Sequence, residues 1–215
     1  MALLGIALAV ALLVLSVRAV LERQKDIFET VQAPPIPYGE MREGDLAFRT
    51  GRGMYSELLD MRKSPADTLL YSHIGLVVGP LEDGRWYVVH AVPSEPDFRG
   101  DFNRVKMETV EDFFAGKRAS GGELVHVNGV EFPKELAAEA MQFARDSIRF
   151  DEDYSLADEN RLYCTELVWR QYMKAGVDLS EGRRTSYAPV VKQPVIEPMD
   201  IRRYKGTERY FYYKD

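Results

Sequence analysis

One cysteine and three histidines determine which chemistry this sequence can support. Cys164 stands at the predicted start of an amphipathic helix, while His73, His90 and His126 each lie in an apolar run typical of a β-strand. A thiol becomes a nucleophile when a neighbouring base takes its proton, and a further polar group commonly orients that base. These four residues therefore contain the minimum set for thiol-dependent catalysis.

Cys164 is a candidate nucleophile because of its position in the first turn of its helix. Backbone N–H groups without partners and the positive end of the helix dipole stabilise a thiolate there, so we expect the thiol pKa to lie below its usual value of about 8.5. The same N–H groups can donate hydrogen bonds to a tetrahedral oxyanion. The competing interpretation is a small buried apolar side chain, the commonest role of a free cysteine.

The histidines differ in their surroundings. Gly75 follows His73 by two residues and leaves room beside the strand, but a structural strand histidine remains the alternative. His90 is the natural third member of a triad, with a ring that fixes the tautomer of His73. His126 alternates with valines in what we expect to be a half-exposed strand, and we assign it to structure. Zinc held by Cys164, His73 and His90 is a further alternative, although they lack the local pair spacing of zinc ligands, and we expect neither metal nor cofactor.

The surrounding pattern predicts an α+β fold with a largely antiparallel sheet packed against helices. Apolar runs at 73–79 and 86–92 flank an Asp-Gly turn signal and predict a hairpin that carries the first two histidines. The helix of Cys164 is expected to be capped by Asn160 and to end at Gly176. Further strands are predicted at 44–49, 104–107, 123–127 and 205–214, and further helices at 55–61, at 110–115 and after Pro133.

Five short motifs resemble one known family. They are Gly-Asp-Leu at 44–46, Ser-His-Ile-Gly at 72–75, Val-Val-His-Ala at 88–91, Phe-Asp at 150–151 and Leu-Tyr-Cys-Thr-Glu-Leu-Val at 162–168. Together they resemble the YiiX/YaeF group of circularly permuted papain-like cysteine hydrolases, relatives of the NlpC-type peptidases and of lecithin retinol acyltransferase. The resemblance implies a permuted papain-like fold, with Cys164 as nucleophile, His73 as general base and His90 in the polar orienting position, which is glutamate in some relatives. Glu166 also matches a family position, and we expect it to anchor structure.

Composition narrows the choice of partners. With 215 residues, 46% of them hydrophobic, the chain can bury one core, and we expect a monomer. A formal net charge of -6 argues against nucleic-acid binding, which needs a dense basic surface. A single cysteine excludes an intramolecular disulfide.

The N-terminus predicts contact with a membrane. Residues 2–17 are apolar or small apart from Ser16, which is near the short limit for a bilayer-spanning helix, and the basic start of a signal peptide is missing. We therefore favour an uncleaved anchor or, second, a signal segment over 1–20, with a buried helix third. A juxtamembrane linker over 21–37 and a hydrolase domain over 38–215 would follow. Positive residues after the span favour a cytoplasmic domain, whereas a wall-peptide substrate favours the outside, which we prefer.

The expected function is a cysteine hydrolase that forms an acyl-enzyme. An amidase or peptidase acting on cell-wall-type peptides is the first hypothesis, because of the resemblance. The alternatives are a lipid-directed thiol acyltransferase or esterase and a non-catalytic binding module with the same fold. Both chemistries need the same thiolate and oxyanion donors, so the motifs alone do not separate them.

Overall fold

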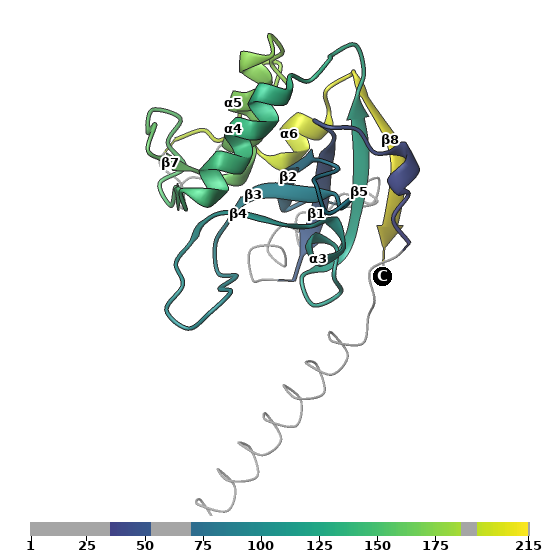
Figure 1. The fold of residues 1–215 in the computed structure, drawn as a ribbon. Helices are drawn as coiled ribbons and strands as arrows, with labels where there is room; N and C mark the ends of the chain where they lie inside the picture. The colour runs from purple at the N-terminus through teal and green to yellow at the C-terminus, as the bar shows by residue number, and fades with distance from the viewer. Residues whose placement is uncertain (1–34, 53–69, 186–192, 215) are drawn as a thin grey trace, which may run out of the picture.

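The computed structural model describes residues 35–52, 70–185 and 193–214, and in them one sheet carries the fold (Figure 1). Its eight described strands are ordered β7-β6-β4-β3-β2-β1-β5-β8 and are antiparallel except at the β6–β7 pair. The strands are β1 (Leu46–Gly51), β2 (His73–Val78), β3 (Tyr87–Val92), β4 (Arg104–Thr109), β5 (Ala119–Val127), β6 (Arg149–Phe150), β7 (Arg161–Leu162) and β8 (Thr207–Lys214). The helices are η1 (Tyr38–Glu40), α3 (Val110–Phe113), α4 (Lys134–Arg145), α5 (Cys164–Lys174) and α6 (Pro198–Arg202).

The predicted α+β arrangement of a largely antiparallel sheet with helices is confirmed. The hairpin predicted from the Asp-Gly signal joins β2 and β3, and the C-terminal segment forms β8 at the sheet edge beside β5. The predicted helix 55–61 and the predicted anchor 1–20 lie outside the described residues. In the described part of the chain, no helix is both long and apolar enough to cross a membrane.

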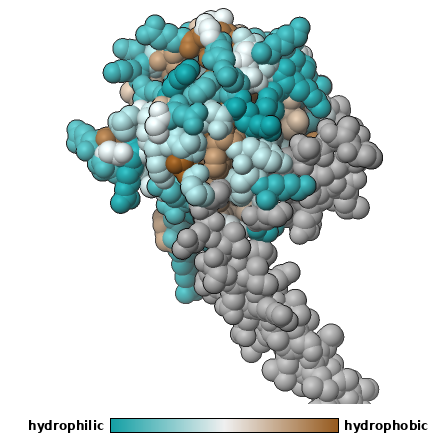
Figure 2. Space-filling view, turned by 90° about the vertical axis from the view of Figure 1, so that its right-hand side faces the viewer, coloured by the Kyte–Doolittle hydropathy of each residue, from teal (hydrophilic) through white to brown (hydrophobic). Residues whose placement is uncertain are grey.

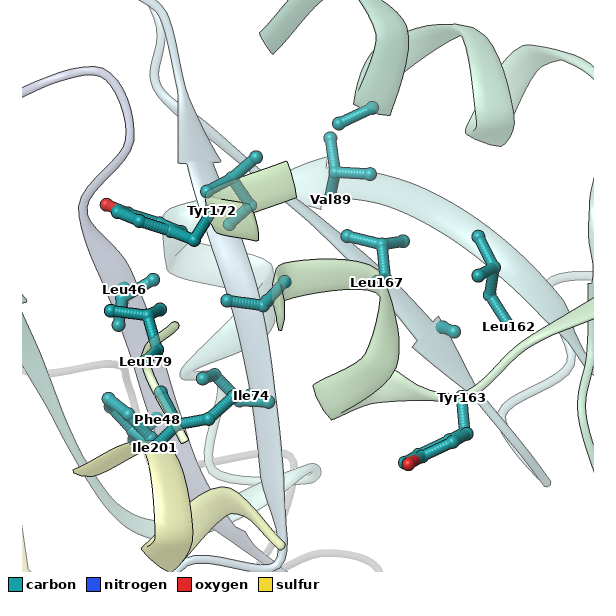
Figure 3. Packing of buried hydrophobic residues seen from close by; sticks show 14 of the residues in the cluster. Leu46, Phe48, Ile74, Val89, Leu162, Tyr163, Leu167, Tyr172, Leu179 and Ile201 are labelled. Carbon is teal, nitrogen blue, oxygen red and sulfur yellow. The ribbon is translucent and has the colours of Figure 1, made fainter. Parts of the chain in front are cut away.

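Strand β2 separates two apolar clusters because its side chains alternate between the faces of the sheet. Ile74 and Leu76 belong to the larger cluster, which includes Leu167 and Tyr172 of α5 (Figure 3). Val77 points to the smaller cluster around Phe113 and Phe114 of the α3 region. The side chain of His73 is on the same alternation as Val77, so the sheet places it on the α3 side, where its ring stacks on Phe113. Cys164 packs against the larger cluster.

The surface of the protein is mainly polar on the face shown in Figure 2, where apolar side chains form small scattered areas. The large apolar side chains that are exposed in the described residues are few: Tyr38, Phe98, Phe102, Met173 and Tyr212. Scattered exposed apolar residues are normal for a folded domain. This face therefore does not identify a site, and the buried polar groups have to do so.

Candidate active site

Cys164 is the first residue of α5, as its predicted place at a helix start requires. The predicted cap Asn160 is wrong, because Arg161 and Leu162 form β7 beside β6 and the chain stays extended through Tyr163, which is the N-cap. The carboxylate of Glu166 accepts a hydrogen bond from Tyr163 N at 3.4 Å and another from Arg170 Nε at 2.9 Å. A carboxylate at this position suits the positive end of the helix and fixes the turn that carries the thiol.

His73 and His90 lie on neighbouring strands with their rings in contact. Nε2 of His73 is 2.7 Å from Nδ1 of His90, and the ring centroids are 4.9 Å apart. Continuing the register that pairs Leu76 with Val89 places His90 opposite Gly75, on the same face as His73. A Cβ on Gly75 would lie 3.1 Å from His90 Cβ and 2.2 Å from Val88 Cγ1. The missing side chain therefore allows the close approach of strand β3 with the side chains of Val88 and His90.

Cys164 and His73 line the same cavity, which has a volume of about 60 Å³. Nε2 of His73 is engaged by His90, which leaves Nδ1 as the ring nitrogen outside this contact. His73 thus lines the cavity together with Cys164 and contacts the buried ring of His90. The other residues that line the cavity are Ser72, Pro93, Phe150, Tyr154, Tyr163, Thr165, Val195, Ile196, Glu197 and Pro198.

Burial dominates the protonation of all three groups. It lowers the pKa of His73 and of His90 well below 6.5, and the positive charge of Arg49 lowers both further. Burial raises the pKa of the Cys164 thiol to about 11, although the N–H groups of Ile74 and Thr165 act in the opposite direction. The expectation of a lowered thiol pKa is therefore wrong, because desolvation outweighs the helix start. The resting site holds a neutral thiol and neutral imidazoles.

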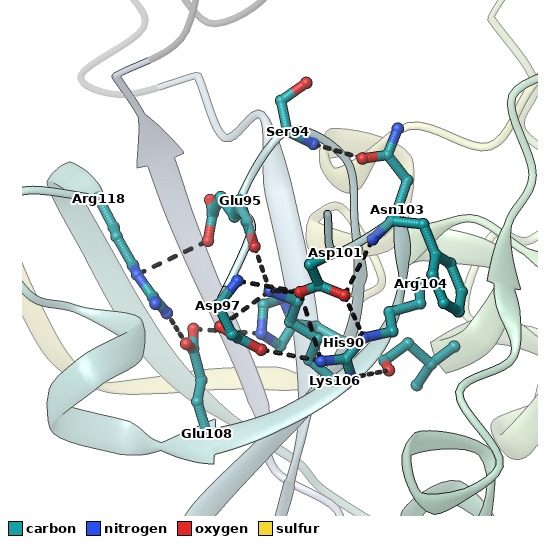
Figure 4. A network of polar contacts seen from close by, with 12 residues as sticks. His90, Ser94, Glu95, Asp97, Asp101, Asn103, Arg104, Lys106, Glu108 and Arg118 are labelled. Carbon is teal, nitrogen blue, oxygen red and sulfur yellow. Dashed lines mark hydrogen bonds and ion pairs between the residues drawn. The ribbon is translucent and has the colours of Figure 1, made fainter. Parts of the chain in front are cut away.

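A cluster of charges that the sequence analysis missed lies behind His90 (Figure 4). Glu108 of β4 approaches Nε2 of His90 with Oε1 at 3.1 Å, a close contact that is not aligned as a standard hydrogen bond. Its carboxylate also contacts Arg49 at 3.5 Å and forms an ion pair with Arg118. Glu95 forms an ion pair with Arg49 and lies 3.8 Å from Arg118. The sequence signal was present as alternating polar residues in Arg104–Thr109.

Further ion pairs hold the loop between β3 and β4 against the sheet. Lys106 of β4 is buried and contacts Asp97 at 2.9 Å, and Arg104 contacts Asp97 and Asp101 at 2.9 and 3.0 Å. Asn103 Oδ1 accepts a hydrogen bond from Ser94 N at 2.8 Å within the same loop. Since Pro93 at the start of this loop lines the cavity, these contacts support one wall of the site.

His126 has a different environment from the other two histidines. Its Nδ1 is 2.9 Å from Asp45 Oδ1, and its ring stacks on Tyr210 with centroids 4.2 Å apart. The expected half-exposed side chain is instead buried, because β8 covers strand β5 and brings Tyr210 onto the ring. His126 does not line the cavity of Cys164, which agrees with its assignment to structure.

The arrangement does not fit a metal shared by Cys164, His73 and His90. Two nitrogens bound tetrahedrally to zinc at about 2.0–2.1 Å lie about 3.3 Å apart, whereas Nε2 of His73 and Nδ1 of His90 face each other at 2.7 Å. That separation is typical of a hydrogen bond between the rings. Among the residues that the structure describes, no group of three or more His, Cys, Asp or Glu side chains could hold a metal ion.

A mixed sheet with few helices, in which a helix-start thiol and a strand histidine line one cavity, is consistent with the class of papain-like folds. The chain belongs to the family of permuted papain-like amidase enzymes YaeF/YiiX, C92, whose model matches residues 40–199. This confirms the resemblance found in the motifs.

A solved structure described as the metalloprotein YiiX from Escherichia coli O157:H7 is similar to this chain. The TM-score is 0.59 at 19% identity, over 81% of this chain and 98% of that one, which shows a shared fold. A comparison with curated proteins gave no match.

Proposed function

We propose that this protein is a cysteine-dependent amidase or peptidase that works through an acyl-enzyme. Cys164 is the nucleophile, His73 is the general base, and His90 orients His73. The observation that carries this assignment is that Cys164 and His73 line one small cavity while His73 bonds to His90 through its other nitrogen. Membership in a family of papain-like amidases supports amide chemistry over the other reactions of a thiol.

The first half of the reaction begins from the neutral pair. Nδ1 of His73 takes the Sγ proton of Cys164 as the sulfur attacks the substrate carbonyl, so no thiolate has to accumulate beforehand. The oxyanion of the tetrahedral intermediate is stabilised by N–H groups at the start of α5. The imidazolium of His73 then gives its proton to the leaving amine, the C–N bond breaks, and a thioester remains on Cys164.

Water completes the cycle. His73 removes a proton from water, the resulting hydroxide attacks the thioester carbonyl, and the C–S bond breaks. The proton returns from His73 to the sulfur as the carboxylic acid leaves. The buried neutral state of His73 suits both halves, because the imidazole starts each as a base.

Cell-wall-type peptides are the proposed substrates. A lipid-directed acyl transferase or esterase is the second candidate, favoured by the apolar segment 2–17, which would hold the domain beside a bilayer. We also propose that this segment is a single-pass anchor and that the domain lies outside the cytoplasm. Full-length protein should then sediment with membranes and resist extraction by salt, whereas a soluble full-length chain with an intact N-terminus would contradict the anchor.

The activity is tested with purified full-length protein, Cys164→Ala and two substrate panels. One panel contains short peptides with free termini, and the other contains phospholipids and acyl esters. The proposal expects release of new amines from peptides by the wild type and none by Cys164→Ala. Release of fatty acid alone would favour the lipid candidate, and equal rates with Cys164→Ala would show that the thiol is not the nucleophile.

A further inference from the structure

Glu108 is in contact with His90 on the side opposite to His73. His90 is fully buried, and its two ring nitrogens face different partners: Nδ1 faces His73 Nε2 at 2.7 Å, and Nε2 faces Glu108 Oε1 at 3.1 Å. Glu108 pairs across the strands with Val88, two residues before His90, so the sheet register aims it diagonally at the ring. The two histidines and Glu108 thus form a line in which the fully buried His90 is the middle member.

The charges around Glu108 favour an ionised carboxylate. Arg49 Nη1 lies 3.5 Å from Oε1, and Arg118 forms an ion pair with Oε2. Arg49 is itself held in place by a hydrogen bond of 3.0 Å to Phe113 O and by the Phe113 ring, 4.5 Å from its Cζ. Opposite charges at this range stabilise the charged form of a carboxyl group, and an ionised carboxylate only accepts hydrogen bonds.

The carboxylate of Glu108 determines which ring nitrogens of His90 and His73 carry a hydrogen. A hydrogen on Nε2 of His90 is favoured because a lone pair there would face the negative Oε1 of Glu108 at 3.1 Å. In the neutral ring Nδ1 is then an acceptor. His73 Nε2 must then carry its hydrogen, which leaves the lone pair on Nδ1, the nitrogen that the proposed function assigns as the base for Cys164. If every donor and acceptor along these three residues were exchanged, Nδ1 of His73 would carry the hydrogen and could not act as a base.

We propose that Glu108 is a positioning residue which, through His90, selects the tautomer of His73 that can accept the thiol proton. The inference rests on the proposed function only for its catalytic consequence, since the tautomers exist whether or not the site is active. Glu108 does not line the cavity, so its effect reaches the reaction through the two rings. Among the described residues, the charged groups that act on His90 come from several elements. They are Glu108 and Lys106 of β4, Arg49 of β1, Glu95 of the loop between β3 and β4, and Arg118.

Glu108→Gln is the variant that separates this role from simple charge pairing. Glutamine keeps the size of the side chain but can also donate, so it allows the reversed line of hydrogen bonds. A matched control is Glu95→Gln, which removes one charge from the same pair of arginines. Glu95 also acts on His90 through its charge, so this variant shows how much of an effect comes from charge alone. Glu108→Asp keeps a group that only accepts and should keep the wild-type tautomers.

The readout is ¹⁵N NMR of the imidazole nitrogens, which distinguishes protonated from unprotonated positions. The chain has only three histidines, and His126, with Nδ1 directed at Asp45, is an internal reference that no variant should change. In the wild type we expect hydrogen on Nε2 of both His73 and His90. Glu108→Gln should populate the reversed tautomers, whereas Glu95→Gln and Glu108→Asp should not.

Kinetics provide the second readout. Replacing the carboxylate behind a catalytic histidine with an amide costs about 10⁴ in kcat when that histidine is the base. Glu108 is separated from His73 by the ring of His90, so its effect should be smaller. We expect Glu108→Gln to lower kcat about 10- to 100-fold with KM unchanged. Glu95→Gln should lack most of this loss of kcat.

Wild-type protein with hydrogen on Nδ1 of His90 would overturn the proposal even if Glu108→Gln did not fold. Unchanged tautomers in folded Glu108→Gln, or an equal kinetic loss in Glu95→Gln, would also overturn it. Wild-type-like turnover in Cys164→Ala, with the expected tautomers present, would instead refute the proposed function and leave the tautomer assignment intact.

Discussion

Nε2 of His73 lies 2.7 Å from Nδ1 of His90, although the two residues belong to different strands and are 17 positions apart. The contact assigns different duties to the two rings. His73 lines the cavity that it shares with Cys164, while His90 is fully buried. The roles proposed for Cys164, His73 and His90 lead to predictions that treat the three histidines unequally.

Alanine variants should rank the histidines by these duties. Cys164→Ala and His73→Ala should each lower kcat by at least about 10²–10⁴, the contribution expected from a general base, and the double variant should lose little more because the two act as one unit. His90→Ala should lose less, and His126→Ala should stay near wild type if it folds. Steady-state kinetics checks the order, and equal losses from His126→Ala and His73→Ala would show that the base has been misassigned.

The Cys164 thiol should lose its proton only at high pH. Because burial raises the pKa of Cys164 to about 11, its alkylation rate should still be rising above pH 9. The His73→Ala variant should show almost the same midpoint, since a neutral imidazole contributes no stabilising charge. Iodoacetamide labelling followed by mass spectrometry measures both curves, with unfolded protein as the reference for the ordinary value of about 8.5. A midpoint below 8.5 in folded protein would restore the helix-start effect as the dominant influence.

Stability should fall as the solution becomes acidic. The pKa values of His73 and His90 are lowered in the folded state, so below about pH 6.5 the unfolded chain binds protons that the folded chain does not. Each such histidine costs about 1.4 kcal/mol per pH unit in the window between its unfolded and folded pKa values. Urea unfolding at pH 7 and pH 5 should show this loss of unfolding free energy. In His90→Asn the dependence of the unfolding free energy on pH should correspond to about one fewer proton taken up on unfolding. The same slope in both proteins would mean that His90 is not held neutral.

Gly75→Ala should damage both the fold and the site. Its Cβ would lie 2.2 Å from Val88 Cγ1 and 3.1 Å from His90 Cβ, and overpacking of this kind costs about 1–3 kcal/mol. Gly39→Ala is a matched control, because nothing lies within 4 Å of the added Cβ. The thermal unfolding temperature and kcat should both fall in Gly75→Ala and should both stay near wild type in Gly39→Ala. A Gly75→Ala protein with normal stability would show that the two strands do not approach this closely.

Local patterns were sufficient for the parts of the site that lie within one element. The apolar runs around His73 and His90 predicted their strands, and the amphipathic pattern after Cys164 predicted its helix. The N-terminal boundary of that helix was not predictable from local pattern, because it depends on pairing between distant segments. The two-residue strand β7 pairs with β6, so the N-cap is Tyr163 and not the predicted Asn160.

Properties that arise between elements were not predictable in the same way. Glu108 reaches His90 only through the register of β3 with β4, which no single-strand pattern specifies. The direction of the Cys164 pKa shift depends on how completely the surrounding elements exclude water, so the local helix start gave the wrong sign. Gly75 was correctly singled out as a place of close approach, but the group that approaches is a neighbouring strand.

The central claim is that Cys164 forms an acyl-enzyme with an amide substrate, and intact-mass spectrometry after rapid acid quenching tests it most directly. Wild type, Cys164→Ala and His126→Ala are each incubated with the peptide panel and, separately, with the lipid panel. We expect a peptide-derived acyl group on the wild type and on His126→Ala, mapped to Cys164, and none on Cys164→Ala. A fatty-acyl adduct in place of the peptide adduct, or peptide turnover with an adduct on another residue, would contradict it.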